Sequence, residues 1–156
     1  MHIQILSVGK TKSPYVSDGE KDYFSRLKHY CQVESIVVSE EKIRKGTQPR
    51  IILQKEGERL LGKISDNSFV VVLDKMGDMC SSEKLSEKFQ NWQNQGIKKL
   101  IFVIGGPLGL DKKVVARADF VLSLSKMTFT HEMTRLILLE QIYRSFTILK
   151  GEKYHK

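Results

Sequence analysis

An unbroken apolar run leads into a glycine-rich loop at Leu100-Ile-Phe-Val-Ile-Gly-Gly-Pro-Leu-Gly-Leu110. Branched and aromatic side chains without alternation are typical of a strand covered on both faces, as in a parallel sheet. Ligands of such sheets bind beyond the carboxyl ends of the strands, where glycine lets the backbone approach them closely. Taken alone, the glycine cluster favours a simpler interpretation, a tight turn between a strand and a helix.

Strands and helices alternate along the rest of the chain. Strands are expected at residues 2–8, 33–38, 69–73, 100–104 and 120–124. Helices are expected at residues 14–30, 50–63, 81–96, 111–118 and 132–147, and the polar segment 39–50 is expected to be a surface loop. This alternation predicts one α/β domain spanning residues 1–156, with a mostly parallel sheet and helices on both of its faces.

The composition is that of a globular protein with an excess of basic residues. The chain has 156 residues and a net charge of +8, which gives an electrostatic reason to meet a polyanion. No segment approaches the ~18 consecutive apolar residues of a membrane span, and the first residues resemble a strand rather than a signal peptide. We therefore expect a cytoplasmic protein.

Cysteine and histidine are few and widely spaced. Cys31 and Cys80 form no CxxC pattern, and the four histidines have no spacing typical of metal ligands. A chain of this length builds a core without covalent or metal cross-links. We expect neither a disulfide nor a bound metal.

Two common nucleotide motifs are absent. Gly9-Lys10-Thr11 imitates the end of a P-loop, but the motif needs a glycine five residues earlier, where this chain has Gln4. The GxGxxG fingerprint does not follow the first strand either. A nucleoside triphosphate site is therefore excluded.

Two C-terminal features leave alternatives open. Residues 122–131, Leu-Ser-Leu-Ser-Lys-Met-Thr-Phe-Thr-His, follow a strand and could read a purine edge, although Thr130 is also explained as a helix N-cap. The last helix, 132–147, is apolar over most of its circumference, which is typical of a core helix or of a subunit interface.

Basic side chains gather near the C-terminus, at Arg135, Arg144, Lys150, Lys153, His155 and Lys156. They are equally consistent with phosphate contacts and with a solvated tail. The pair Tyr154-His155 is more specific, because these residue types stack on bases and move protons.

Four of these motifs, at their spacing, closely resemble the RlmH family of SPOUT-class methyltransferases. They are Ile104–Leu110, Leu122–His131, Arg135–Arg144 and Tyr154–Lys156, and the resemblance extends to Val8-Gly9-Lys10 and Lys55-Glu56-Gly57. The one departure is Thr130, where many members have proline.

The resemblance implies a function and an architecture. It implies S-adenosylmethionine-dependent methylation of N3 of a pseudouridine in bacterial large-subunit ribosomal RNA. Because the sequence shows no attached RNA-binding module, we expect the assembled ribosome to be the substrate rather than free RNA. It also implies a homodimer and a trefoil knot in the C-terminal part of the chain. A non-enzymatic protein that binds RNA or the ribosome is the alternative, and S-adenosylmethionine binding would distinguish the two.

The resemblance also implies a set of site residues. The cofactor is expected to contact Leu73, Gly105, Leu124, Ser125, Lys126, Met127, Thr128 and Phe129. For proton removal from the imide nitrogen we expect His155 to act as the base, because imidazole titrates near neutral pH. Arg144 is expected to stabilise negative charge on the base carbonyls, and Tyr154 to stack on the uracil ring.

Overall fold

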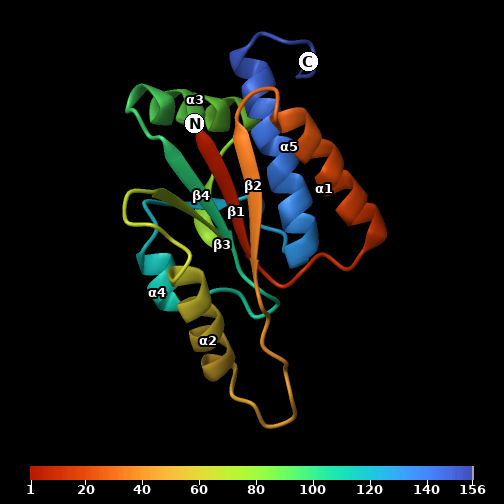
Figure 1. Ribbon diagram of the computed structural model, residues 1–156, viewed down its shortest axis with the longest axis vertical. Coiled ribbons are helices and arrows are strands. Elements are labelled where there is room, and N and C mark those ends of the chain that lie inside the picture. Colours follow the sequence, from red (N-terminus) through yellow and green to blue (C-terminus); the bar gives the residue numbers. More distant parts are fainter. Residues whose placement is uncertain (156) are drawn as a thin grey trace.

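The computed structural model describes residues 1–155, and Lys156, one of the predicted basic residues, lies outside this range (Figure 1). Its five-stranded sheet has the order β2-β1-β4-β3-β5, and every pair is parallel. The strands are β1 (His2–Val8), β2 (Gln32–Val38), β3 (Phe69–Met79), β4 (Lys99–Ile104) and β5 (Phe120–Ser123). The helices are α1 (Pro14–Leu27), α2 (Pro49–Leu61), α3 (Ser82–Asn94), α4 (Lys112–Ala116) and α5 (His131–Leu149).

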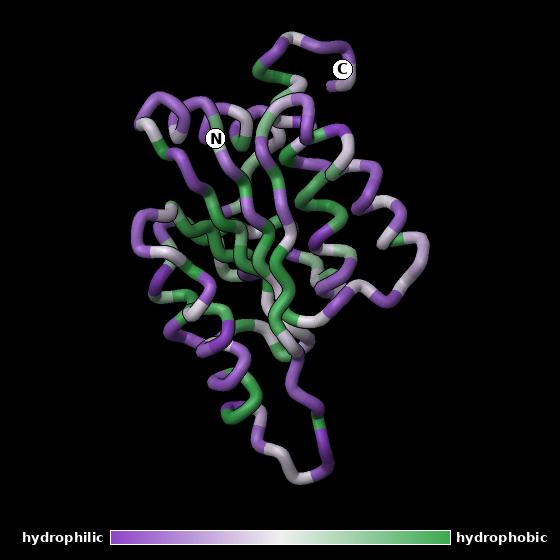
Figure 2. The backbone as a smooth tube through the Cα atoms, viewed as in Figure 1, coloured by the Kyte–Doolittle hydropathy of each residue, from purple (hydrophilic) through white to green (hydrophobic). Residues whose placement is uncertain are grey.

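The helices form one layer on each face of the sheet. Because successive strand residues point to opposite faces, Leu100, Phe102 and Ile104 of β4 join a core with α1, α3 and α5. Ile101 and Val103 point the other way, into a core with α2 and α4. Figure 2 shows the result, with hydrophobic residues concentrated along the central strands and hydrophilic residues more frequent in the helices and loops around them. The predicted α/β class and parallel sheet are confirmed.

The strand predicted at residues 69–73 is much shorter than the observed strand β3. β3 continues beyond residue 73 to Met79, and its pairing with β5 shifts there, because Leu73 and Asp78 both lie opposite Leu122. Residues 74–77 thus leave the ladder as a bulge. The strand signal ended at Leu73 because the following residues are polar or exposed, and a bulge interrupts the alternation on which the prediction depends.

The last helix is covered mainly by its own chain. α5 packs between α1 and α3 and has no fully exposed residue along its length. This packing accounts for its apolar circumference without a second subunit, so the homodimer stays a prediction, as does the trefoil knot. The expected N-cap is confirmed, because the Thr130 hydroxyl accepts a hydrogen bond from Met133 N at 3.2 Å.

Candidate functional site

A pocket opens at the carboxyl ends of β3 and β5. Its empty space, counted together with the open mouth towards solvent, is about 400 Å³. Parallel sheets bind ligands at this edge, because loops that leave neighbouring strands there face one another. The pocket is lined by Leu73, Asp74, Lys75, Leu122, Ser123, Leu124, Ser125, Met127, Thr128, Phe129 and Thr134.

Hydrogen bonds between residues close in sequence shape the loop that follows β5. The Ser125 hydroxyl accepts a hydrogen bond from Met127 N at 2.9 Å, and the Ser123 hydroxyl donates to Ser125 O at 3.1 Å. The loop therefore turns back on itself and passes directly into α5. Its side chains and backbone form one wall of the pocket, opposite the end of β3.

Six of the eight predicted cofactor residues line this pocket, while Gly105 and Lys126 do not. Gly105 lies at the exit of β4, the strand next to β3. Its loop closes tightly, because a Cβ on Gly105 would lie 2.4 Å from Gly109 O. Gly109 N in turn donates to Gly106 O at 3.0 Å. The tight-turn interpretation of this cluster is confirmed, and its role in cofactor binding stays a prediction.

Large apolar side chains lie exposed around the pocket. Met76 is 85% exposed and Met127 is 75% exposed, and Met79 and Phe129 are also exposed. These four residues, here called the apolar rim, belong to the end of β3 and the loop after β5. Exposed apolar groups that gather in one place are typical of a binding surface.

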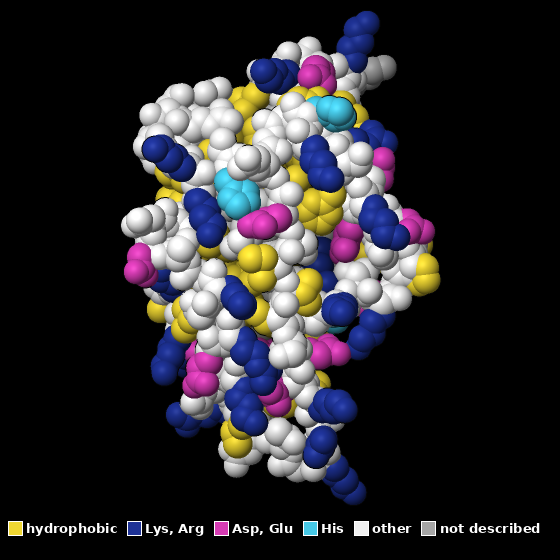
Figure 3. Space-filling model, viewed as in Figure 1, with side chains coloured by type: hydrophobic (Ala, Val, Ile, Leu, Met, Phe, Trp, Pro, Cys, Tyr) yellow, Lys and Arg dark blue, Asp and Glu magenta, His cyan; other side chains and the backbone are white. Residues whose placement is uncertain are grey.

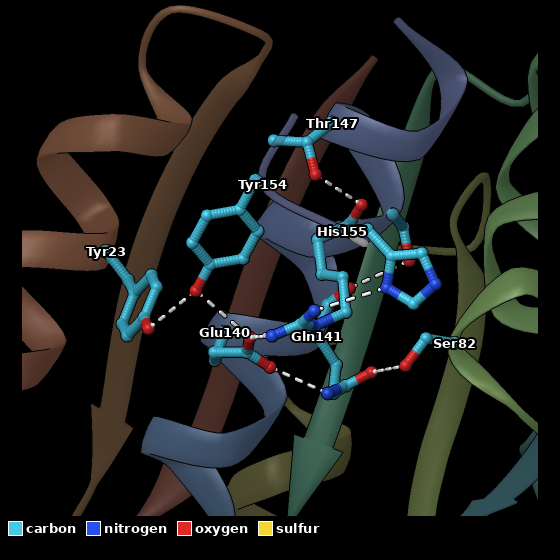
Figure 4. A network of polar contacts seen from close by, with 9 residues as sticks. Tyr23, Ser82, Glu140, Gln141, Thr147, Tyr154 and His155 are labelled. Atoms are coloured by element: carbon cyan, nitrogen blue, oxygen red, sulfur yellow. Dashed lines mark hydrogen bonds and ion pairs between the residues drawn. The ribbon is translucent and has the colours of Figure 1, made fainter. Parts of the chain in front are cut away.

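The three predicted catalytic residues lie together in a polar network (Figure 4). Arg144 donates to Glu140 Oε1 from Nε at 2.9 Å, and its Nη1 lies 3.2 Å from His155 Nδ1. The Tyr154 hydroxyl donates to the same carboxylate at 3.1 Å, and its ring packs under the Arg144 guanidinium. Desolvation, with a hydrogen bond to Tyr23, raises the pKa of Tyr154 above its usual range. Glu140 thus orients two of the three side chains.

The second ring nitrogen of His155 is also engaged. His155 Nε2 lies 2.8 Å from Glu83 Oε1, at the start of α3. Hydrogen bonds from Ser81, from its own backbone N–H and from His155 lower the pKa of Glu83 to about 2. The imidazole is therefore held between a guanidinium and a carboxylate.

Within a single chain, the polar network lies far from the pocket. Thr134 lines the pocket near the start of α5, and Arg144 comes ten residues later on the same helix. At the rise of an α-helix the two residues are separated by about 15 Å along its axis. Figure 1 shows the C-terminus beyond the end of α5, at the same end of the sheet as the start of β1 and opposite the strand exits. A single chain therefore does not bring the predicted base to the predicted cofactor.

Arg135 does not belong to an exposed phosphate-binding cluster, and this part of the sequence prediction is wrong. The side chain is 3% exposed, and its Nη2 donates to Val8 O at 2.6 Å and Gly9 O at 2.7 Å. Its Nη1 donates to the Thr11 hydroxyl at 3.0 Å. Arg135 instead attaches the exit loop of β1 to α5.

A comparison with protein families identifies the chain. The family described as "Predicted SPOUT methyltransferase" matches residues 1–155. The chain belongs to this family. Such an enzyme requires a methyl donor, and the pocket at the exits of β3 and β5 is the candidate site for it.

Two curated relatives match this chain over its full length, and a solved structure shares its fold. "Ribosomal RNA large subunit methyltransferase H" of Halothermothrix orenii is 50% identical, with 100% of both chains covered. The protein of the same name from Desulfotalea psychrophila is 47% identical over 100% of both chains. A probable methylase family protein from Haemophilus influenzae has the same fold, with a TM-score of 0.57 at 13% identity over 99% of this chain and 70% of that one.

Several residues of the candidate site were not predicted. Asp74, Lys75 and Thr134 line the pocket, and Glu140 anchors the polar network. The position of residues 74–75 directly after the apolar run 69–73 was a usable signal, and so was the spacing of Glu140 four residues before Arg144. In residues 1–155 no group of three or more potential ligands could hold a metal ion. No helix of this range is long and apolar enough to cross a membrane.

Proposed function

We propose that this SPOUT methyltransferase methylates N3 of a pseudouridine in large-subunit ribosomal RNA, with S-adenosylmethionine as the methyl donor. The observation that carries the proposal is the pocket at the exits of β3 and β5, in a chain whose full-length relatives are named ribosomal RNA large subunit methyltransferases. Residues 1–156 act as one catalytic domain. Its trefoil knot would hold the loop after β5 in place.

The pocket residues fit the proposed donor. Leu73, Leu124 and Phe129 offer apolar contacts to an adenosyl group, while the backbone of 124–129 offers donors and acceptors for the adenine edge. Lys126 and Gly105 complete the proposed contacts from outside the pocket wall. When bound, S-adenosylmethionine supplies a methyl group on a positively charged sulfur, which is open to attack by a ring nitrogen.

The polar network suits the chemistry at the target base. His155 would accept the imide proton, and Arg144 would stabilise the negative charge that develops on the carbonyl oxygens. Tyr154 would stack on the ring. Alignment of donor and acceptor supplies a large part of such a rate, on the order of 7–11 kcal/mol of barrier in well-oriented systems.

These roles require a homodimer. The network and the pocket are about 15 Å apart along α5, and the apolar rim leaves Met76 and Met127 exposed beside the pocket. A second copy seated on the rim would cover these side chains and bring its own C-terminal tail to the pocket. Each active site would then combine the pocket of one subunit with the tail of the other.

A mixing experiment tests this arrangement. One variant carries His155→Ala, and the other carries Thr128→Trp, which fills the pocket. If the sites are built in trans, the two inactive variants, mixed and allowed to exchange subunits, should recover about a quarter of the wild-type rate, because half of the dimers are mixed and each of these has one intact site out of two. Sites built within one subunit predict no recovery.

Basic side chains at the strand exits would bind the phosphates of the substrate RNA. Figure 3 shows Lys and Arg gathered over the lower part of the molecule, where α2 and the loop before it lie. Lys42, Arg44, Lys45 and Arg50 are exposed there. Phosphate contacts of this kind are sensitive to salt and carry no sequence information, so a preformed surface such as the assembled ribosome, in the cytoplasm, is the proposed substrate.

The reaction is tested by mass spectrometry of ribosomal RNA from cells that lack the gene. The proposal predicts the loss of one methyl group from a modified uridine, and its return when the wild-type gene is supplied. Complementation with Thr128→Trp is expected to fail. Unchanged RNA in the deletion strain would refute the proposed substrate.

A further inference from the structure

The motif Lys55-Glu56-Gly57 has no part in the site described so far. It lies on α2, in the helix layer that faces away from α5. Glu56 and Gly57 nevertheless lie against the segment that leaves β4. Lys55 and Glu56 contact the segment that leaves β2.

Glu56 lies between the two segments. Its side chain is 3% exposed, and its Oε1 accepts a hydrogen bond from Glu41 N at 2.9 Å. Its Oε2 has no hydrogen-bond partner among residues 1–155 and faces the β4 exit, where a Cβ added to Gly106 would lie 3.1 Å from it. Desolvation raises the pKa of this carboxyl, while the hydrogen bond from Glu41 opposes the shift.

Gly57 brings α2 against the same exit segment. A Cβ on Gly57 would lie 2.7 Å from the Cβ of Asp111, so a larger residue would push the helix away. Asp111 in turn caps α4 by accepting a hydrogen bond from Lys113 N at 2.8 Å. Both ends of the loop between β4 and α4 therefore rest on α2.

The other contacts of α2 hold the segment after β2. Lys55 Nζ lies 3.9 Å from a carboxylate oxygen of Glu41, and Arg59 pairs with the same carboxylate. Arg59 Nη1 also donates to Ser39 O at 2.9 Å. Directly after this anchored stretch come the exposed basic residues of the proposed RNA-facing loop.

We infer that Glu56 is a positioning residue, which holds the Gly105–Gly109 loop in its binding shape and joins it to the basic loop 39–44. Burial of a carboxylate with an unpaired oxygen is unfavourable, so stability alone would place an apolar side chain here. The carboxylate is long enough for one oxygen to accept the hydrogen bond from Glu41 N, while the other occupies the space beside Gly106 that a Cβ there would need. This inference rests on the proposed function, because it assigns the loop at Gly105 to methyl donor binding.

Calorimetric titration with S-adenosylmethionine tests the inference. Glu56→Asp keeps the charge but removes one methylene of reach, whereas Glu56→Gln keeps the reach and removes the charge. We expect affinity to fall about tenfold in Glu56→Asp and to stay within about threefold in Glu56→Gln. Glu58→Asp, an exposed position on the same helix, is the matched control and should bind as the parent does.

A second measurement separates positioning from a general loss of structure. Amide hydrogen exchange in Glu56→Asp should increase at Glu41 and at 105–110, and stay unchanged in β1 and α5. If Glu56→Asp does not fold, Gly106→Ala replaces it, because its methyl group would lie 3.1 Å from the Glu56 carboxylate and should lower affinity in the same way.

The possible outcomes are distinct. The inference would be overturned if a folded Glu56→Asp bound S-adenosylmethionine with parental affinity, and the same holds for Gly106→Ala where that variant replaces it. An equal loss of affinity in Glu56→Gln and Glu56→Asp would also overturn it. An absence of heat with the unmodified protein would instead refute the proposed methyl donor, and would leave the exchange measurement as the test of the contacts of Glu56.

Discussion

Substitution of Gly77 by alanine should separate β3 from β5 at the edge of the pocket. Gly77 closes the bulge of β3, and a Cβ there would lie 2.6 Å from Val121 O and 2.9 Å from the carbonyl carbon of Leu122. Both contacts are with backbone, so no side chain can rotate away. To reach an ordinary contact of 3.4 Å, the strands must move apart by about 0.8 Å, which is enough to break a ladder hydrogen bond.

The size of the effect follows from the groups involved. Overpacking of this kind costs about 1–3 kcal/mol, and each lost backbone hydrogen bond adds about 1 kcal/mol. We expect Gly77→Ala to lower the free energy of unfolding by about 3 kcal/mol, and the melting temperature by about 6–12 °C for a chain of this size. Because Leu122 and Ser123 line the pocket, the affinity for S-adenosylmethionine should fall at least about tenfold.

Calorimetry measures both quantities on one preparation. Gly62→Ala is the matched control, because a Cβ there would meet its nearest atom at 3.4 Å and Gly62 has helical φ and ψ. The control should melt at or slightly above the parental temperature. A Gly77→Ala protein that melts within about 1 °C of the parent would show that the strands are not in contact here, and the reasoning would fail.

Three further predictions concern stability. Arg135→Met leaves two backbone carbonyls unpaired in the core and should cost about 3 kcal/mol in urea unfolding. Thr130→Ala removes the N-cap of α5 and should cost about 1 kcal/mol in the same assay. The Glu83 carboxylate, with its pKa lowered from 4.5 to about 2, stabilises the fold above pH 4.5. That contribution should disappear as the pH falls towards 2, and Glu83→Gln should remove it at every pH.

Each of these has a contradicting result. Parental stability of Arg135→Met would mean that the guanidinium is not held by the exit loop of β1. Parental stability of Thr130→Ala would argue against a specific cap. A stability difference between parent and Glu83→Gln that does not shrink in acid would show that the carboxylate is not stabilised by its neighbours.

Local patterns were sufficient to predict most of the fold. Continuous apolar runs identified β4 and the first part of β3, because strands buried on both faces carry no polar residues. Residues 122–129 were also recognisable as a candidate binding segment, because they include the end of a strand of a parallel sheet and the loop that leaves it. The glycine cluster at 105–109 was correctly predicted to be a turn, and nothing in its local pattern distinguishes that turn from a binding loop.

The sequence by itself determined the α/β class, the parallel sheet and the strand exits that form the pocket, since each depends on short-range periodicity and on a general rule of sheet geometry. Only the tertiary structure decided that Arg135 is buried, that β3 bulges at 74–77, and that Tyr154 and His155 lie far from the pocket of their own chain. These facts depend on which surfaces meet across distant parts of the sequence. A residue type records what a side chain can do, whereas its neighbours in space decide which of those interactions occur.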